Sequence, residues 1–216
     1  MVAVPIGNPQ DISLRALETL KAADLIIGEE RKETARLLRS LKIDNKPIEL
    51  LNEHSDSRDI ETLIELCRSQ NVALVSDAGT PGFCDPGANL VQRCRSQGIA
   101  VTSNPGASSL MTLLSLSGHR LDRFVFEGFL PAERESRESR LTQLIGEKRA
   151  LILMDTPYRL GRLLSDLSRH MADRRILIGL NLTSSEEKIR EGFPTQLEKE
   201  FQGQKAEFIL IVLPKN

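Results

Sequence analysis

Short apolar runs alternate with amphipathic helical patterns along almost the whole chain, and this alternation constrains the fold more than any other feature of the sequence. In the first half we expect strands at residues 2–4, 25–28, 47–51, 72–76 and 99–103. Apolar residues recur between these runs at helical spacing, as in the helices expected after Asp11 and from Ser57 onward. The alternation predicts a parallel sheet with helices on its faces, in a first α/β domain that spans residues 1–116.

The second half has a different pattern. Its strands are expected at residues 124–129, 150–154, 176–182, 188–192 and 208–213. A short polar segment, 183–187, separates two of these runs, which predicts a hairpin and therefore a mixed sheet. The pair Ser117-Gly118 follows a helical pattern and precedes a new strand. We therefore expect a second α/β domain over residues 117–216.

Composition and charge exclude several classes of protein. The 216 residues carry 29 Lys and Arg against 30 Asp and Glu, so the net charge of −1 excludes a strongly basic chain that attracts nucleic acid through its overall field. A membrane-spanning helix needs about 18 consecutive apolar residues, and no run in the sequence is that long. The N-terminus lacks the features of a signal peptide. The three cysteines and three histidines show no disulfide or metal-ligand spacing. We expect a cytoplasmic protein with no metal and no membrane association.

Three expected strand ends in the first domain are rich in Gly, Pro, Ser and Asp, at residues 5–11, 76–87 and 104–109. Ligands bind beyond the carboxyl ends of the strands in an open parallel sheet, so these loops should lie along one edge. Four of their side chains suit hydrogen bonds to an amino acid or a ribose: Asp77, Thr80, Ser108 and Ser109. A single loop of this kind is more often only a turn, but three together favour a binding site. Phosphate-loop, dinucleotide-binding and nucleophile-elbow motifs are absent, so we expect a ligand cradle rather than a nucleophile.

Four longer strings carry a resemblance to a known family: PIGNPQDISLRAL from Pro5, SDAGTPG from Ser76, PGASS from Pro105 and FEGFLP from Phe126. With them the chain resembles the tetrapyrrole methylase-like (class III) S-adenosylmethionine (SAM)-dependent methyltransferases over nearly its whole length. Within that superfamily it is most similar to the small-subunit ribosomal RNA cytidine-2′-O-methyltransferases, without their C-terminal extension. The resemblance implies two α/β domains with SAM in a cleft between them, a homodimer, and ribosomal RNA or the small ribosomal subunit as partner.

The positions that match the family imply which residues hold SAM. In the first domain they are Pro5, Ser76, Asp77, Ala78, Gly79, Thr80, Ser108 and Ser109. In the second domain Met154, Leu182 and Ala206 are implied on the adenine side. Departures fall mainly on positions that would face the acceptor. The family's Glu-Asp-Thr-Arg is Glu-Glu-Arg-Lys at residues 29–32, and its Glu-Leu-Thr-Lys is Asn-Leu-Thr-Ser at residues 181–184.

A ribose hydroxyl is weakly acidic, so a base within hydrogen-bond reach would assist its methylation. Glu30, Glu53 and His54 are the candidates, because they follow the second and third expected strands. The simpler interpretation of each is a solvated surface residue. Two other functions stay open: methylation of a small acidic metabolite such as a tetrapyrrole precursor, and a SAM-binding module without turnover. The first is weakened because the superfamily's usual Gly-Asp-Pro is Ser-Asp-Ala at residues 76–78.

An RNA substrate requires positive charge in one place. Arg134, Arg137 and Arg140 recur every three residues, but glutamates interleave with them, so a solvated and self-paired helix is favoured over a phosphate contact. A second basic cluster is expected near the edge of the cleft. It consists of Arg31, Lys32, Arg36 and Arg39.

Overall fold

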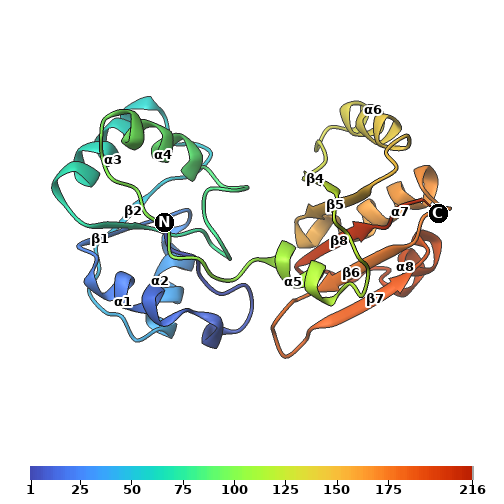
Figure 1. Ribbon diagram of the computed structural model, residues 1–216, viewed down its shortest axis with the longest axis horizontal. Helices are drawn as coiled ribbons and strands as arrows, with labels where there is room; N and C mark the ends of the chain where they lie inside the picture. The colour runs from blue at the N-terminus through green and yellow to red at the C-terminus, as the bar shows by residue number, and fades with distance from the viewer. Residues whose placement is uncertain (216) are drawn as a thin grey trace. The chain divides into compact units, whose positions relative to one another are not determined.

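The computed structural model describes residues 1–215 and divides into two compact units, the first ending at Ser108 and the second beginning at Ser109 (Figure 1). The division lies before helix α5 (Ser109–Leu116), whereas the sequence places the domain boundary after residue 116. α5 groups with the second unit because it contacts strand β8 (Phe208–Val212) there. The α5 residues contribute a mostly apolar helix to that unit.

The first unit is a parallel sheet in the order β2-β1-β3, with helices on both faces. Its strands are β1 (Leu25–Gly28), β2 (Ile48–Leu50) and β3 (Val72–Leu74). Its helices are η1 (Pro9–Asp11), α1 (Leu14–Ala22), α2 (Arg31–Ser40), α3 (Ser57–Ser69) and α4 (Gly87–Ser96). One apolar cluster joins α1 and α2 to the sheet and another joins α3 and α4, so the two pairs cover opposite faces (Figure 1). The predicted parallel α/β architecture is confirmed.

Side-chain caps define where two of the predicted helices begin. The Ser13 hydroxyl accepts a hydrogen bond from the Ala16 N–H at 3.1 Å, which caps α1. Asp56 and Asp59 form a reciprocal capping box at the start of α3. These caps satisfy main-chain donors that the first helical turn leaves without a partner.

Two of the five strands predicted in the first unit do not form regular strands, so these two predictions are wrong. Residues 2–4 make only isolated bridges, from Val2 to Asn104 and from Val4 to Gly79, and residues 99–103 make none. Pro5 directly follows the first segment and Pro105 directly follows Asn104. Neither proline carries an N–H, so the pairing stops there. The first segment still continues the sheet, because the Val2 N–H donates to the Leu74 carbonyl at 2.9 Å.

The second unit is a mixed sheet in the order β4-β5-β8-β6-β7. Besides β8, its strands are β4 (Phe124–Gly128), β5 (Ala150–Asp155), β6 (Ile176–Leu180) and β7 (Lys188–Gly192). Besides α5, its helices are α6 (Arg134–Leu144), η2 (Pro157–Arg159), α7 (Leu160–His170) and α8 (Pro194–Glu200). β4 and β5 are parallel, β8 is antiparallel to both β5 and β6, and β6 and β7 form the predicted hairpin. The mixed sheet is confirmed.

Helix α6 corrects the prediction of a solvated, self-paired arginine helix. Arg137 is only 1% exposed and forms buried ion pairs with Asp166 of α7 and Asp155 at the end of β5. Arg140 makes two hydrogen bonds to Glu127 of β4, at 2.6 and 2.7 Å. These two arginines therefore pair with other elements of the fold, because their long side chains and planar heads reach carboxylates beyond their own helix.

Candidate functional site

The three loops singled out in the sequence meet at the edge of the first unit where its strands end. The Val4 N–H donates to the Gly79 carbonyl at 2.8 Å, which joins the first loop to the loop after β3. The Thr80 hydroxyl donates to the Ala107 carbonyl at 3.0 Å, which joins that loop to the third. Pro5, Gly79, Thr80 and Ala107 therefore lie close together, although up to about a hundred residues separate them in the chain.

The loop after β3 is braced from within. The buried Ser76 hydroxyl donates to the Ala78 carbonyl at 3.2 Å, so this side chain stabilises the loop itself. The Asp85 carboxylate accepts hydrogen bonds from the Gly82 and Gly87 N–H groups, at 2.7 and 3.1 Å. Asp77, Ala78 and Thr80 remain exposed on this braced loop and are the members of the predicted set that can meet a ligand with their side chains.

Two carboxyl groups cross-link the loop after β1 to the loop after β3. The Asp77 N–H donates to the Glu29 carboxylate at 3.1 Å, and the Glu30 N–H donates to the Asp77 carboxylate. Partial burial raises the pKa of both Glu29 and Asp77, and neighbouring negative charges, including that of Glu30, add to the effect. The edge therefore carries concentrated negative charge and suits a ligand with positive charge.

Glu29 is the residue that reasoning from sequence missed, since Glu30 was the predicted base. Glu30 precedes α2 as its N-cap residue and is exposed, whereas Glu29 is half-buried with a raised pKa. The available signal was position: Glu29 directly follows the last residue of a fully buried strand. Perturbed carboxyl groups in such places are candidates for function.

We expect Glu29→Gln to make the stability of the protein less dependent on pH. A carboxyl group with a raised pKa in the folded state binds its proton more tightly there, so folding stability falls as pH rises from the ordinary carboxyl pKa through the raised value. The amide removes this loss but still accepts the Asp77 N–H. The melting temperature of the variant minus that of the wild type should become more positive from about pH 4 to about pH 7. Glu53→Gln, at an exposed position, serves as control, and a Glu29→Gln profile that superimposes on the wild type would contradict the assignment.

Glu53 and His54, the other two predicted bases, lie in the loop after β2. Since β2 runs parallel to β1, this loop is at the same edge of the sheet. Their side chains are 86% and 85% exposed and lie 3.8 Å apart, and the His54 N–H donates to the Asn52 side chain at 3.0 Å. Such exposure leaves both side chains in contact with water.

The residues predicted in the second unit also gather at one edge of their sheet. Met154 is near the end of β5, Leu182 follows β6, and Ala206 precedes the antiparallel strand β8. The Asn181 N–H donates to the Glu207 carbonyl at 2.8 Å, which holds the last two segments together. Leu182 and Ala206 are buried, whereas Met154 is half-buried. Ser109, the first residue of α5, is half-buried, as is Ser108 at the end of the first unit.

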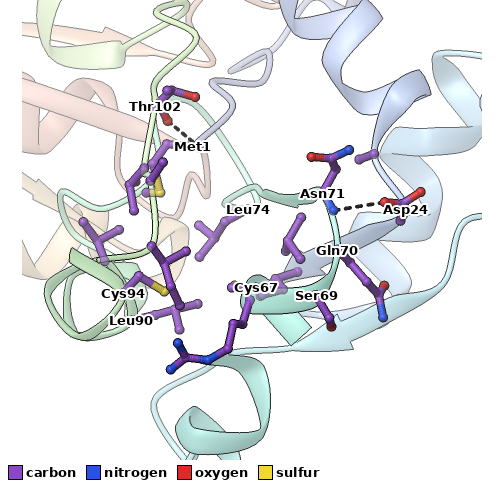
Figure 2. Close-up of a pocket in the computed structure, with 18 of the residues that line it drawn as sticks. Met1, Asp24, Cys67, Ser69, Gln70, Asn71, Leu74, Leu90, Cys94 and Thr102 are labelled. Carbon is purple, nitrogen blue, oxygen red and sulfur yellow. Dashed lines mark hydrogen bonds between the residues drawn. The ribbon is translucent and has the colours of Figure 1, made fainter. Parts of the chain in front are cut away.

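A cavity of about 830 Å³ lies at the opposite edge of the first sheet, where the strands begin, and Figure 2 shows residues that line it. None of the predicted site residues is among them. Cys67 and Cys94 face this cavity, and burial raises the pKa of the Cys67 thiol to about 12, so it is not a thiolate at neutral pH. Within residues 1–215, no group of three His, Cys, Asp or Glu side chains is placed to hold a metal ion.

The chain is similar to known proteins both in sequence and in fold. The family model described as Tetrapyrrole (Corrin/Porphyrin) Methylases matches residues 1–198. The chain belongs to this family. It is thus a methyltransferase of the tetrapyrrole methylase type. A solved structure of a diphthine synthase has a TM-score of 0.79 and 18% sequence identity, and the match covers 99% of this chain and 88% of that one. At this identity the likeness establishes the fold alone.

Several relatives within the tetrapyrrole methylase family bear the name ribosomal RNA small subunit methyltransferase I. The one from Synechocystis sp. is 40% identical over 89% of this chain and 69% of its own length. The one from Borrelia garinii subsp. bavariensis is 36% identical over 98% of this chain and 96% of its own length. The one from Coprothermobacter proteolyticus is 36% identical over 99% of this chain and 96% of its own length. The similarity thus extends over both units of this family member.

Proposed function

We propose that this methyltransferase uses SAM to methylate a ribose 2′-hydroxyl of small-subunit ribosomal RNA, in the cytoplasm and as a homodimer. The observation that carries the proposal is the similarity, at 36–40% identity over most of the chain, to proteins named ribosomal RNA small subunit methyltransferase I. Two further observations are consistent with it. No helix within residues 1–215 is long and apolar enough to cross a membrane, and Cys67, Cys84 and Cys94 are free thiols.

The charge at the edge of the first sheet suits SAM. When bound, SAM supplies a methyl group on a positively charged sulfonium, and it also carries an ammonium group. The carboxylates of Glu29 and Asp77 give the first edge the opposite charge. We assign the donor to Pro5, Asp77, Ala78, Gly79, Thr80 and Ser108 of the first unit, with Ser76 bracing the loop, and to Ser109, Met154, Leu182 and Ala206 of the second.

The acceptor hydroxyl needs to be held in line with the methyl group, and such orientation alone contributes about 7–11 kcal/mol in well-aligned reactions. Glu30, Glu53 and His54 stay the proposed bases, and the structure adds Glu29, whose raised pKa suits proton transfer better than an ordinary carboxyl. All four lie at the edge where β1 and β2 end. A shared edge is consistent with an acceptor that approaches the donor from these loops.

Transfer of a labelled methyl group from SAM to small ribosomal subunits tests the proposal. The subunits come from cells that lack this enzyme, and SAM binding and mass are measured on the same preparation. We expect a dimer of twice 24.1 kDa and label in the RNA at a ribose that resists alkaline cleavage. A protein that binds SAM but leaves the subunits unlabelled contradicts an RNA substrate. Label on an acidic tetrapyrrole instead supports a metabolite methyltransferase, and no transfer to either class supports a SAM-binding module.

A further inference from the structure

Helix α2 carries a basic stripe beside the candidate site. Lys32, Arg36 and Arg39 recur at i, i+4 and i+7, which places them on one face of the helix, and Arg31 precedes them in the first turn. All four side chains are exposed. Thr34 and Leu38, on the opposite side, are buried against the unit. Together, Arg31, Lys32, Arg36 and Arg39 form what we call the α2 basic stripe.

Most of the charge on this stripe is not neutralised by the protein. Arg36 pairs with Glu33 one turn away, but within residues 1–215 no ion pair is found for Arg31, Lys32 or Arg39. Helix α6 is different, since Arg137 is buried with Asp155 and Asp166. Of the two arginine-rich helices, only α2 therefore presents an exposed row of cations to a partner.

The stripe begins at the predicted acceptor edge. Two residues, Glu29 and Glu30, separate the end of β1 from the start of α2. The guanidinium of Arg36 lies close enough to Asp77 to lower the pKa of that carboxyl group, against the larger effect of burial. From Arg31 to Arg39 the helix rises about 12 Å, so the cations extend away from the edge along a distance that spans more than one nucleotide.

We propose that the α2 basic stripe binds the phosphate backbone of the RNA next to the ribose that is methylated. The inference rests on the proposed function, because it names the surface that holds the same substrate. Exposed Lys and Arg heads bind phosphates by charge and release the counterions that surround the RNA. The net charge of −1 leaves no overall field that could attract RNA, so a local row of cations has to do so.

The test is the salt dependence of binding to small ribosomal subunits from cells that lack the enzyme. We expect the triple variant Lys32→Ala/Arg36→Ala/Arg39→Ala to reduce the slope of log affinity against log salt by about 2 to 3, since each lost phosphate contact removes about 0.7–0.9. At about 0.1 M salt this corresponds to roughly 100- to 1000-fold weaker binding. The charge-keeping variant Lys32→Arg/Arg36→Lys/Arg39→Lys should retain most of the slope.

The matched control removes three exposed cations elsewhere, Lys21, Arg95 and Lys199, and should leave the slope unchanged. A slope that stays at the wild-type value in the stripe variant, or that falls equally in the control, would overturn the inference. If the wild type methylates the subunits while the stripe variant binds them normally, the stripe proposal fails and the proposed function stands. If the wild type neither binds nor methylates them, both proposals fail.

Discussion

Arg137→Met is expected to lower the free energy of unfolding of the second unit by about 3–5 kcal/mol. The guanidinium lies in the interior of that unit between the carboxylates of Asp155 and Asp166, which are also buried. Removing it leaves two buried negative charges with only their outer partners, Arg159 and Arg169. A buried charge that loses its partner destabilises a fold far more than an exposed one does.

Urea denaturation followed by tyrosine fluorescence measures the free energy of unfolding of the second unit, to which Arg137 belongs. Tyr158 is the only tyrosine, tryptophan is absent, and Tyr158 lies in η2 of the second unit. Arg134→Met, on the exposed part of the same helix, is the control and should change stability by less than about 0.5 kcal/mol. Adding Asp155→Asn and Asp166→Asn to Arg137→Met should recover part of the loss. A loss below about 1 kcal/mol for Arg137→Met would show that the ion pairs are not what stabilises α6.

Gly79→Ala is expected to reduce methyl transfer by on the order of 100-fold. Gly79 has a φ of +80°, and an added Cβ would lie 3.2 Å from the Ile6 side chain and 3.5 Å from the Ala107 carbonyl. Both contacts belong to the other two loops of the site. The Ile6 contact is tight and the alanine also has to adopt a left-handed backbone, so the loop after β3 shifts against its neighbours. A displacement of about 1 Å in a residue that positions a substrate costs about two orders of magnitude in rate.

Gly98→Ala separates this effect from loss of stability. Gly98 has nearly the same backbone strain, with a φ of +74°, but an added Cβ has no neighbour within 4 Å. Both variants should lose about 1–2 kcal/mol of stability from the left-handed conformation, and only Gly79→Ala should lose SAM affinity and turnover. Equal turnover in the two variants would contradict a role for Gly79 in the site.

Local patterns in the sequence predicted most of the secondary structure. The hairpin strand Lys188–Gly192 has the expected bounds, and Ser13 caps α1. The strand bounds were predicted from the sequence and the cap was found in the structure, and both depend on neighbours in the chain. Residues 2–4 have the composition of a strand, but whether they form a ladder depends on Asn104 and on Pro5, which removes a donor.

The environment of the site residues could not be predicted in the same way. Glu29 and Glu30 are adjacent and chemically alike, but the Glu29 carboxylate accepts the N–H of Asp77, which lies in another loop, whereas Glu30 contributes its N–H to the Asp77 carboxylate. Arg137 matched the spacing of a surface stripe, and its burial arises from Asp155 and Asp166, which follow it in the chain. Contacts between distant segments decided these cases, and a single sequence does not record them.

The place of β8 in the second sheet has a consequence for how the chain folds as it is synthesised. β8 lies between β5 and β6 and forms hydrogen bonds with both. Without β8, the pair β4-β5 and the pair β6-β7 are not joined into one sheet. The first unit is complete at Ser108 and can fold while the remainder is being made. Until residues 208–212 leave the ribosome, the second half exposes two apolar strand edges on which another chain can pair. A nascent chain stalled before Phe208 therefore combines a folded first half with an aggregation-prone second half.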